Sequence, residues 1–324
     1  MTYTPITNVA ANEAGDDVRA KLNAMIAEVN MNAKLSKTLF VDGARTDTYV
    51  ADGSKTKPFK TLVAAAAAAS AGDVIVATPG TYADDVTIPG GVSLVGYSDA
   101  SVVTTGDVTF EAGSPSRSIY GIVFHGTDKT LTLNGTCNIK GSYSKSKVVC
   151  GATAAIYAVA FPVKCEETDA DAITFGGVYL RLFDSEVEAT GDASAIVQTA
   201  GQFIGNTVHA KNEAAANATI LSTGGTVGLS SSIVANAGGG EAINVSDNDG
   251  EAINPNGLNG IIAAGNIVCG TKHTVRGVIY SMSGTVAGDE LLGNILVKNG
   301  INGSLTCGDK TATVVDGQIT AIAE

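Results

Sequence analysis

Three acidic residues alternate along one short segment of the chain. Asp184, Glu186 and Glu188 lie two positions apart, so on a β-strand all three would project from one face. Residues two apart on a strand are separated by about 6.6 Å at the backbone, and the paired carboxylates that cleave glycosidic bonds stand about 5–9.5 Å apart. The spacing therefore permits an acid–base pair. We favour the alternative, a solvated charged face that keeps the sheet from pairing with neighbouring sheets.

A second acidic cluster follows further along the chain. Asp247, Asp249 and Glu251 lie around Gly250, and oxygen-rich loops that contain glycine can hold calcium. The spacing departs from that of the EF-hand loop, and no second acidic strand follows. We therefore favour a solvent-exposed turn over a metal site.

The remaining reactive residue types are isolated. No carboxylates cluster in the sequence beside the three histidines, His125, His209 and His273, which favours surface or turn positions. The five cysteines form no C-x-x-C pair and match no disulfide or zinc spacing, so we expect small buried apolar side chains. The cysteines are Cys137, Cys150, Cys165, Cys269 and Cys307. We expect neither a cofactor nor a metal.

Composition narrows the class of protein. The 324 residues include 39 Gly and no Trp, and 44% are hydrophobic, which excludes collagen and disordered chains. A net charge of −12 argues against a surface for nucleic acid or anionic membranes. The longest apolar run, residues 62–69, is too short to cross a bilayer, and the N-terminus does not resemble a signal peptide. We expect synthesis in a reducing cytoplasm.

Two helices are predicted near the start of the chain. Within residues 13–35, an apolar stripe formed by Val18, Leu22, Met25 and Val29 has the spacing of a helix seam. The stripe fits either packing on the body or self-association, and we favour self-association. A second helix is predicted over 60–71, where six alanines run together. Short strands follow this helix, as expected of a cap over a sheet.

From about residue 100 the chain becomes repetitive. A loose four-residue pattern recurs in irregular steps in the twenties and thirties, and each step holds two or three short strands. This pattern is typical of the coils of a parallel β-helix, with Gly and Asn at the sharp turns. The rival fold, a β-sandwich, would show regular hairpin turns. The pattern begins at Asp184, Gly205, Ser231, Gly265 and Gly293, and its final aliphatic residues, predicted to stack in the interior, are Val187, Val208, Val234, Val268 and Leu296.

Three segments carry resemblances to known families. Residues 52–96, with Pro58-Phe59-Lys60-Thr61-Leu62 and Pro79-Gly80-Thr81-Tyr82, resemble the opening of the pectin-lyase-like superfamily. Those proteins are right-handed single-stranded parallel β-helices whose first coil is covered by a short helix. Residues 16–26 resemble N-terminal segments of bacteriophage tail fibres and tailspikes. Residues 312–322 form a predicted hairpin with an Asp-Gly turn and look like the terminal hairpin of phage structural proteins.

The expected fold is therefore all-β, a right-handed single-stranded parallel β-helix with an N-terminal helix, a capping helix and a C-terminal hairpin. We expect a virion-attachment segment at 1–38, a capping helix and first coil at 39–97, a β-helix body at 98–285, and a last coil with the hairpin at 286–324. The resemblance implies a non-enzymatic bacteriophage virion protein of the tail-fibre, tailspike or capsid-decoration kind. Its expected partners are other virion proteins, two further copies in a homotrimer, and a host-surface glycan.

Two other functions remain open. Tailspikes that resemble this chain include polysaccharide depolymerases, which keep their carboxylates on an outward β-helix face. For this chain the pair would come from Asp184, Glu186 and Glu188, and the enzyme would be a glycoside hydrolase or a polysaccharide lyase. The other alternative is an adhesin that binds glycan without cleaving it. The expected location is the virion, assembled in the host cytoplasm.

Overall fold

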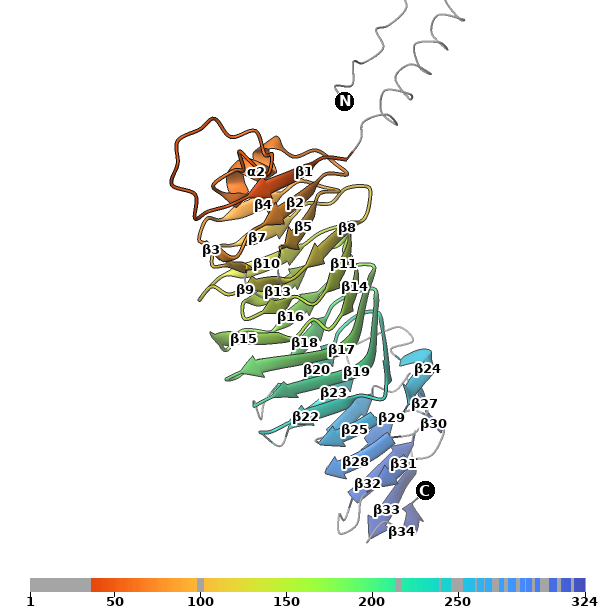
Figure 1. Cartoon of the computed structure of the whole chain (residues 1–324). Helices are drawn as coiled ribbons and strands as arrows, with labels where there is room; N and C mark the ends of the chain where they lie inside the picture. The colour runs from red at the N-terminus through yellow and green to blue at the C-terminus, as the bar shows by residue number, and fades with distance from the viewer. Residues whose placement is uncertain are drawn as a thin grey trace, which may run out of the picture. The chain divides into compact units, whose positions relative to one another are not determined.

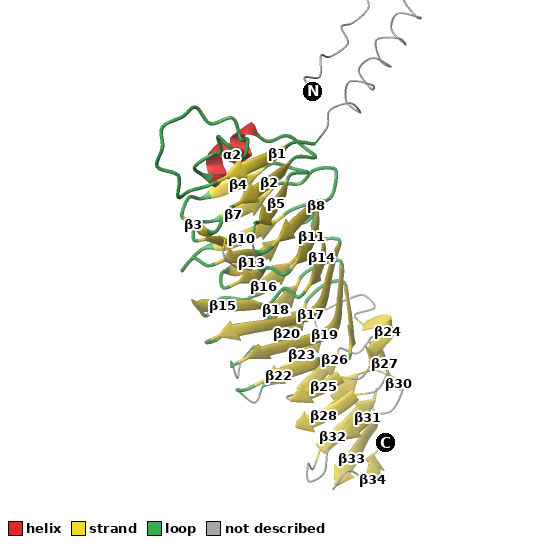
Figure 2. Ribbon diagram, viewed as in Figure 1, coloured by secondary structure: helices red, strands yellow, loops and turns green. Residues whose placement is uncertain are grey.

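Short strands are the predominant element of the described chain, with loops and turns between them (Figure 2). In most of these strands every second residue is buried. The structure is a computed structural model, and it describes residues 36–97, 102–213, 217–238 and 240–245, followed by strands alone between 253 and 323. Residues Thr38–Glu324 form one unit and Met1–Lys37 another. In the larger unit, strands from successive coils pair in parallel and lie one beyond the next (Figure 1). The predicted parallel β-helix is confirmed.

Sheet 1 has 19 strands and bends at a corner, which divides it into two arms. The first arm contains the strand segments before the corner and the second arm those after it; β17 and β19 run through the corner. The strands are β1 (Thr38–Val41), β2 (Val74–Ala77), β3 (Gly80–Tyr82), β5 (Ser93–Gly96), β6 (Val102–Thr104), β8 (Arg117–Tyr120), β9 (Ile122–Phe124), β11 (Thr136–Lys140), β12 (Tyr143–Ser144), β14 (Ala155–Val159), β15 (Val163–Thr168), β17 (Tyr179–Thr190), β19 (Gln202–Asn212), β21 (Thr226–Ser230), β22 (Ile233–Asn236), β24 (Ile253–Asn259), β25 (Ile261–Ala264), β28 (Ile279–Ser283) and β31 (Ile295–Val297).

Sheet 2 has 13 strands, one from nearly every coil, and forms another face of the β-helix. The strands are β4 (Val86–Ile88), β7 (Val108–Phe110), β10 (Thr130–Leu133), β13 (Lys147–Cys150), β16 (Ile173–Phe175), β18 (Ile196–Gln198), β20 (Ile220–Ser222), β23 (Glu241–Val245), β26 (Asn266–Cys269), β29 (Val286–Gly288), β32 (Gly303–Cys307), β33 (Lys310–Val315) and β34 (Gln318–Ala323). A further pair is formed by β27 (Thr274–Arg276) and β30 (Glu290–Leu292).

From Gly121 to Ser231 the corner of sheet 1 is made by one residue per coil in the left-handed backbone conformation. Gly was expected at such turns, yet the later coils use Asp184 at φ +48°, Thr207 at +54° and Ser231 at +48°. Left-handed φ is unfavourable for residues with a Cβ, and most so for a β-branched one such as Thr. Here the strands on both sides of the corner are fixed by their pairing with the coils above and below, which holds these residues in place.

The residue after each corner follows an alternating rule. From Ile122 to Ser232 this inward position is apolar in one coil and serine in the next. Ser185 is typical: its hydroxyl accepts the Phe161 N–H of the preceding coil at 3.2 Å and donates to the Phe183 carbonyl at 2.8 Å. Each serine thus satisfies a backbone donor that would otherwise be buried without a partner. The column consists of Ile122, Ser142, Phe161, Ser185, Val208 and Ser232.

The interior stacking predicted from the four-residue pattern is confirmed only in part. Val187, Val208 and Val234 are fully buried, but Val208 pairs with Ser185, so it occupies a different column from Val187. Val268 lies in β26 of sheet 2 and Leu296 in β31 of sheet 1. Their side chains lie outside what the structure describes, so for these two residues the interior stacking stays a prediction.

A short helix covers the first coil, as expected. It spans α2 (Leu62–Ala68) rather than the predicted 60–71. Thr61 begins it by accepting the Ala64 N–H on its hydroxyl at 3.1 Å, an N-cap. Leu62, Ala65 and Ala66 are buried against the sheet below. The small side chains bring the helix close to the strands, so the apolar interior of the first coil is covered.

The C-terminal strands reverse direction. β32 pairs with β29 in parallel, but β33 and β34 pair antiparallel, with Val315 opposite Gln318. This confirms the predicted C-terminal hairpin. In the part of the chain that the structure describes, no helix is long and apolar enough to cross a bilayer.

Candidate functional site

The three alternating carboxylates do not share one strand face. Asp184 occupies the corner of sheet 1, where the left-handed backbone interrupts the alternation. Glu186 and Glu188 follow on the second arm and face outward. They differ in environment, because Glu186 is exposed whereas the Glu188 side chain is only 14% exposed. Of the three predicted residues, therefore, the outward face pairs only Glu186 with Glu188.

Glu188 lies between two lysines from adjacent coils. In the strand register, Lys164 of β15 and Lys211 of β19 stand on either side of it. Lys164 Nζ lies 3.0 Å from Glu188 Oε2, and Lys211 Nζ lies 3.5 Å from Oε1. Both carboxylate oxygens are thus engaged by ammonium groups. Because parallel strands place register partners one above the other, the fold itself builds this ion pair.

The lysines determine the protonation state of Glu188. Burial raises its pKa, but the hydrogen bond from Lys164 and the charges of both lysines outweigh burial, so the pKa of Glu188 lies below its usual value. A general acid needs the opposite shift, since it must carry a proton near neutral pH. Glu188 is therefore an ionised carboxylate with fixed partners.

A second carboxylate on the same face is held in the same way. Glu166 of β15 accepts from Lys145 Nζ at 2.7 Å and lies 3.3 Å from His125 Nε2. The hydrogen bond from Lys145 lowers the pKa of Glu166, and His125 adds to the effect. The expectation that no carboxylate lies beside the histidines is wrong for His125, because stacking of coils brings Glu166 next to it from 41 residues away in sequence.

The second arm thus carries a ladder of ion pairs that run across coils. Two similar ion pairs, which we do not count in the ladder, lie where sheet 2 begins. Lys147 reaches Glu167 at 3.3 Å, and Lys129 reaches Asp85 at 2.9 Å. Each pair joins groups that are about 20 or more residues apart in sequence. We call the set of Lys145, Lys164, Glu166, Glu188 and Lys211 the ionic ladder.

The outward face of sheet 2 carries no ionisable group in its central column. Thr109, Thr132 and Val149 are typical of this column, which is continuous in register from β4 to β23. Neither a nucleophile nor an acid or base is available from these side chains. The full column is Thr87, Thr109, Thr132, Val149, Thr174, Val197, Leu221 and Asn244.

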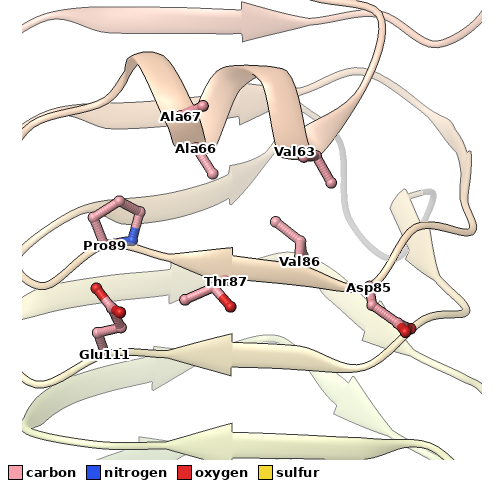
Figure 3. A pocket seen from close by; sticks show the side chains of 8 residues that line it. All are labelled: Val63, Ala66, Ala67, Asp85, Val86, Thr87, Pro89 and Glu111. Carbon is pink, nitrogen blue, oxygen red and sulfur yellow. The ribbon is translucent and has the colours of Figure 1, made fainter.

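A groove of about 420 Å³ lies between α2 and the first strands of sheet 2 (Figure 3). Small and aliphatic side chains form most of its wall, with Ala66 and Val63 of the helix facing Val86 of β4. The two carboxylates at its margin are Asp85 and Glu111. Asp85 is already engaged by Lys129 and by the Asp107 N–H. The groove is therefore a concave, mostly apolar surface without a free acid–base pair.

The other predicted site residues fall outside the described residues. These are the attachment-helix residues Val18, Leu22, Met25 and Val29 and the possible calcium ligands Asp247, Asp249 and Glu251. Among the residues that the structure describes, no group of three His, Cys, Asp or Glu could hold a metal ion. Cys137, Cys150 and Cys165 are free and buried, as the sequence predicted for them.

The lysine partners of Glu188 were not identified from the sequence. Their signal lies in the coil length, because Lys164 and Lys211 stand 24 residues before and 23 residues after Glu188. The corner positions Asp184, Thr207 and Ser231 repeat at similar intervals. An alignment of the coils on these corners would place opposite charges in one column.

Comparison with known proteins assigns the chain to no family. No protein-family model matches the chain, and no curated protein matches it. Solved structures similar to it include pectate lyase Pel9A, at 13% identity over 79% of this chain and 70% of that one, with a TM-score of 0.34. The mannuronan C-5 epimerase AlgE6 A-module of Azotobacter vinelandii is 12% identical over 76% of this chain and 88% of that one (TM-score 0.35). A rhamnogalacturonan lyase is 11% identical over 78% and 74% (TM-score 0.30).

Proposed function

We propose that this chain is a non-enzymatic structural component of a bacteriophage virion, a fibre, spike or capsid-decoration protein that acts as a homotrimer. The observation that carries the non-enzymatic part is the placement of Glu188 between Lys164 and Lys211. Both oxygens are occupied and the pKa is lowered, so this carboxylate does not supply the protonated acid that cleavage of a glycosidic bond requires.

The remaining surfaces of the described body agree with this proposal. The central column of sheet 2 offers neutral Thr, Val, Leu and Asn side chains, and the groove beside α2 lacks an acid–base pair. Support for the virion comes from the sequence, through the resemblance of residues 16–26 and 312–322 to phage proteins. In this proposal the β-helix is a rigid spacer, and the ends of the chain make the contacts with other virion proteins.

A direct experiment tests the virion proposal. Antibody raised against residues 38–324 is used to label particles of the phage that encodes the chain, in electron micrographs, and mass spectrometry of purified particles determines its copy number. We expect labelled projections and a copy number that is a multiple of three. Absence of the chain from purified particles would overturn the proposal.

The second candidate is a polysaccharide depolymerase, favoured by one specific observation. The outward face of β12, β15 and β17 gathers Tyr143, Lys164 and Glu186 close to Glu188, and these residue types can act as acids and bases. If this face were catalytic, the purified chain would lower the viscosity of a host capsular polysaccharide. Lys164→Gln or Glu188→Gln would then abolish that activity while leaving the fold intact.

A further inference from the structure

The first arm of sheet 1 differs from the rest of the body in its charge. Its strand segments, from β1 to β21, contain neither Asp nor Glu, although the whole chain carries a net charge of −12. Two cations face outward from it, Lys140 of β11 and Arg181 of β17. Neither makes a salt bridge with any residue that the structure describes, whereas Lys145, Lys164 and Lys211 of the ionic ladder are all paired.

Aromatic rings gather on the same arm. Tyr120 and Tyr157 are 37% and 41% exposed, and both project outward from successive parts of the sheet. The ring centroids of Tyr157 and Phe183 lie 5.0 Å apart with a 35° tilt. Arg181 lies with its guanidinium carbon 5.0 Å from the Tyr179 ring centroid. Although the sequence holds few aromatic residues, stacking of coils gathers Tyr157, Tyr179 and Phe183 around one arginine, and Tyr120 lies further along the same arm.

The strand register places these side chains on one outward surface. β8, β11, β14 and β17 lie in succession (Figure 1), and Tyr120, Lys140, Val159 and Phe183 form one outward column. Three strand spacings separate the first ring from the last, which is about 14 Å.

The Arg181 guanidinium lies half-buried on the outward face of β17. Its Nε is buried, so a ligand would bond to the two outer nitrogens of the guanidinium. The Tyr179 ring orients the guanidinium, and a guanidinium held in this way is suited to a bidentate bond with a carboxylate. Polar side chains border the rings, with Asn138 on β11 and Gln202 and Asn206 on β19. The arm therefore combines stacking faces, hydrogen-bonding groups and unpaired positive charge.

We propose that the outward face of the first arm, formed by Tyr120, Lys140, Tyr157, Tyr179, Arg181 and Phe183, binds an acidic saccharide. Sugar rings present a C–H face that packs on tyrosine and phenylalanine rings, and their hydroxyls bond to the bordering amides. The carboxylate or sulfate groups of the saccharide pair with Arg181 and Lys140, so the ligand is complementary in charge to this face. The face lies across the corner from the ionic ladder, and binding there involves no cleavage.

This inference goes beyond the proposed function, because a structural virion protein need not bind a saccharide. The competing occupant of the face is a second copy of the chain. A copy would also bury the rings, so the experiment measures saccharide binding and self-association in parallel. Incorporation into particles is scored separately, so that a failure of either proposal can be told from a failure of the other.

The experiment titrates the full chain with uronic-acid oligosaccharides from alginate, hyaluronate and polygalacturonate, each beside its carboxyl-reduced form. Because the chain has no Trp, its fluorescence comes from nine tyrosines, and the loss of quenching in a Tyr157→Ala variant would locate the binding at this face. We expect quenching by at least one acidic oligosaccharide, with binding that weakens as salt rises and is at least about tenfold weaker for the carboxyl-reduced form. Tyr157→Ala and Arg181→Gln should each weaken binding about tenfold or more.

The matched control is the other arginine–tyrosine pair of the body. Arg45 lies 5.3 Å from the Tyr49 ring but is already paired with Asp47, so Arg45→Gln should leave saccharide binding unchanged. Melting curves establish that each variant folds. The proposal is overturned if no acidic oligosaccharide binds at millimolar concentration, or if Arg181→Gln and Arg45→Gln weaken binding equally. It is also overturned if Tyr157→Ala changes only the sedimentation of the chain, which would assign the face to a second copy.

Discussion

Ser185→Ala tests whether the serines behind the corner hold the coils together. Ser185 is 4% exposed, and its hydroxyl is the hydrogen-bond partner of the Phe161 N–H. Alanine removes that acceptor and leaves a buried donor unpaired beside Phe161, which is itself 2% exposed. An unsatisfied buried donor costs about 1–3 kcal/mol. For a chain of 324 residues, with an unfolding entropy of about 2.1 cal/mol/K per residue, the same loss lowers Tm by roughly 1.5–4.5 °C.

Two measurements check this value. Thermal unfolding of the full chain gives the change in Tm. Hydrogen exchange at the Phe161 amide reports the local bond, and its protection should fall by about fivefold to 150-fold for the same free energy. Ser118→Ala is the control, because Ser118 faces outward on β8; we expect its free energy of unfolding to change by less than about 0.5 kcal/mol.

The alternation predicts the same loss of amide protection at the next serine of the column on either side of Ser185. Ser142→Ala should expose the Ile122 amide to exchange, and Ser232→Ala the Val208 amide. The sites lie about two strand spacings apart and share no partner, so their effects should add. If Ser185→Ala matched the Ser118→Ala control and the Phe161 amide stayed fully protected, the hydrogen-bonding role of the column would be refuted.

Four further outcomes follow from the geometry. Val187→Asp should lower the free energy of unfolding by several kcal/mol, because it buries an unpaired charge. Val197 faces outward, so Val197→Asp should change that free energy little. Urea unfolding measures both values. Glu188→Gln should lower the free energy of unfolding by about 1 kcal/mol, whereas Glu186→Gln should leave it almost unchanged. The folded pKa of Glu188 is lowered from 4.5, so the stability that Glu188 contributes is present above pH 4.5 and is lost as the pH falls through the folded pKa. The Tm of the Glu188→Gln variant should therefore depend less on pH in the acid range than the Tm of the unchanged chain. Burial raises the pKa of the Cys150 thiol, so a thiol reagent should modify it only after unfolding. The chain 38–324 should fold with an unchanged melting curve, because α2 covers the first coil; aggregation would instead assign the N-terminal segment to the core.

The fold was accessible from the sequence because its signals are local. The alanine run, the short β-rich pieces and the Asp-Gly turn each act within a few residues, and all three became the expected elements. Register was less accessible. The four-residue pattern set Gly205 opposite Asp184, whereas the structure sets Thr207 there. Gly was a misleading marker, since neighbouring coils hold Thr207 and Ser231 in a conformation that these residues do not favour alone.

The candidate site shows the same limit. The sequence identified Glu186 and Glu188 as an alternating pair, but its reasoning treated each strand in isolation. The partners that fix the charge of Glu188 come from coils above and below, and the environment of Glu166 is completed by His125 from two coils away. Such contacts depend on coil length, which varies along the chain. The aromatic face was missed for the same reason, because rings that lie in register are far apart in sequence.

The residue after the corner of sheet 1 alternates between apolar and serine from coil to coil, and this limits how such a chain could lengthen. A β-helix grows by duplicating coils, and any duplicated coil must offer correct hydrogen-bonding partners to the coils on both sides. Here an apolar corner residue is followed by a serine corner residue, so the repeating unit is two coils, as in Phe161 with Ser185. Duplication of an apolar-corner coil alone would set two apolar residues in contact and leave one corner amide without its serine. A gene-level insertion of about 47 residues, such as a copy of 161–207, keeps the apolar–serine alternation at the corner, so in this respect the length of the molecule is adjustable in steps of a coil pair.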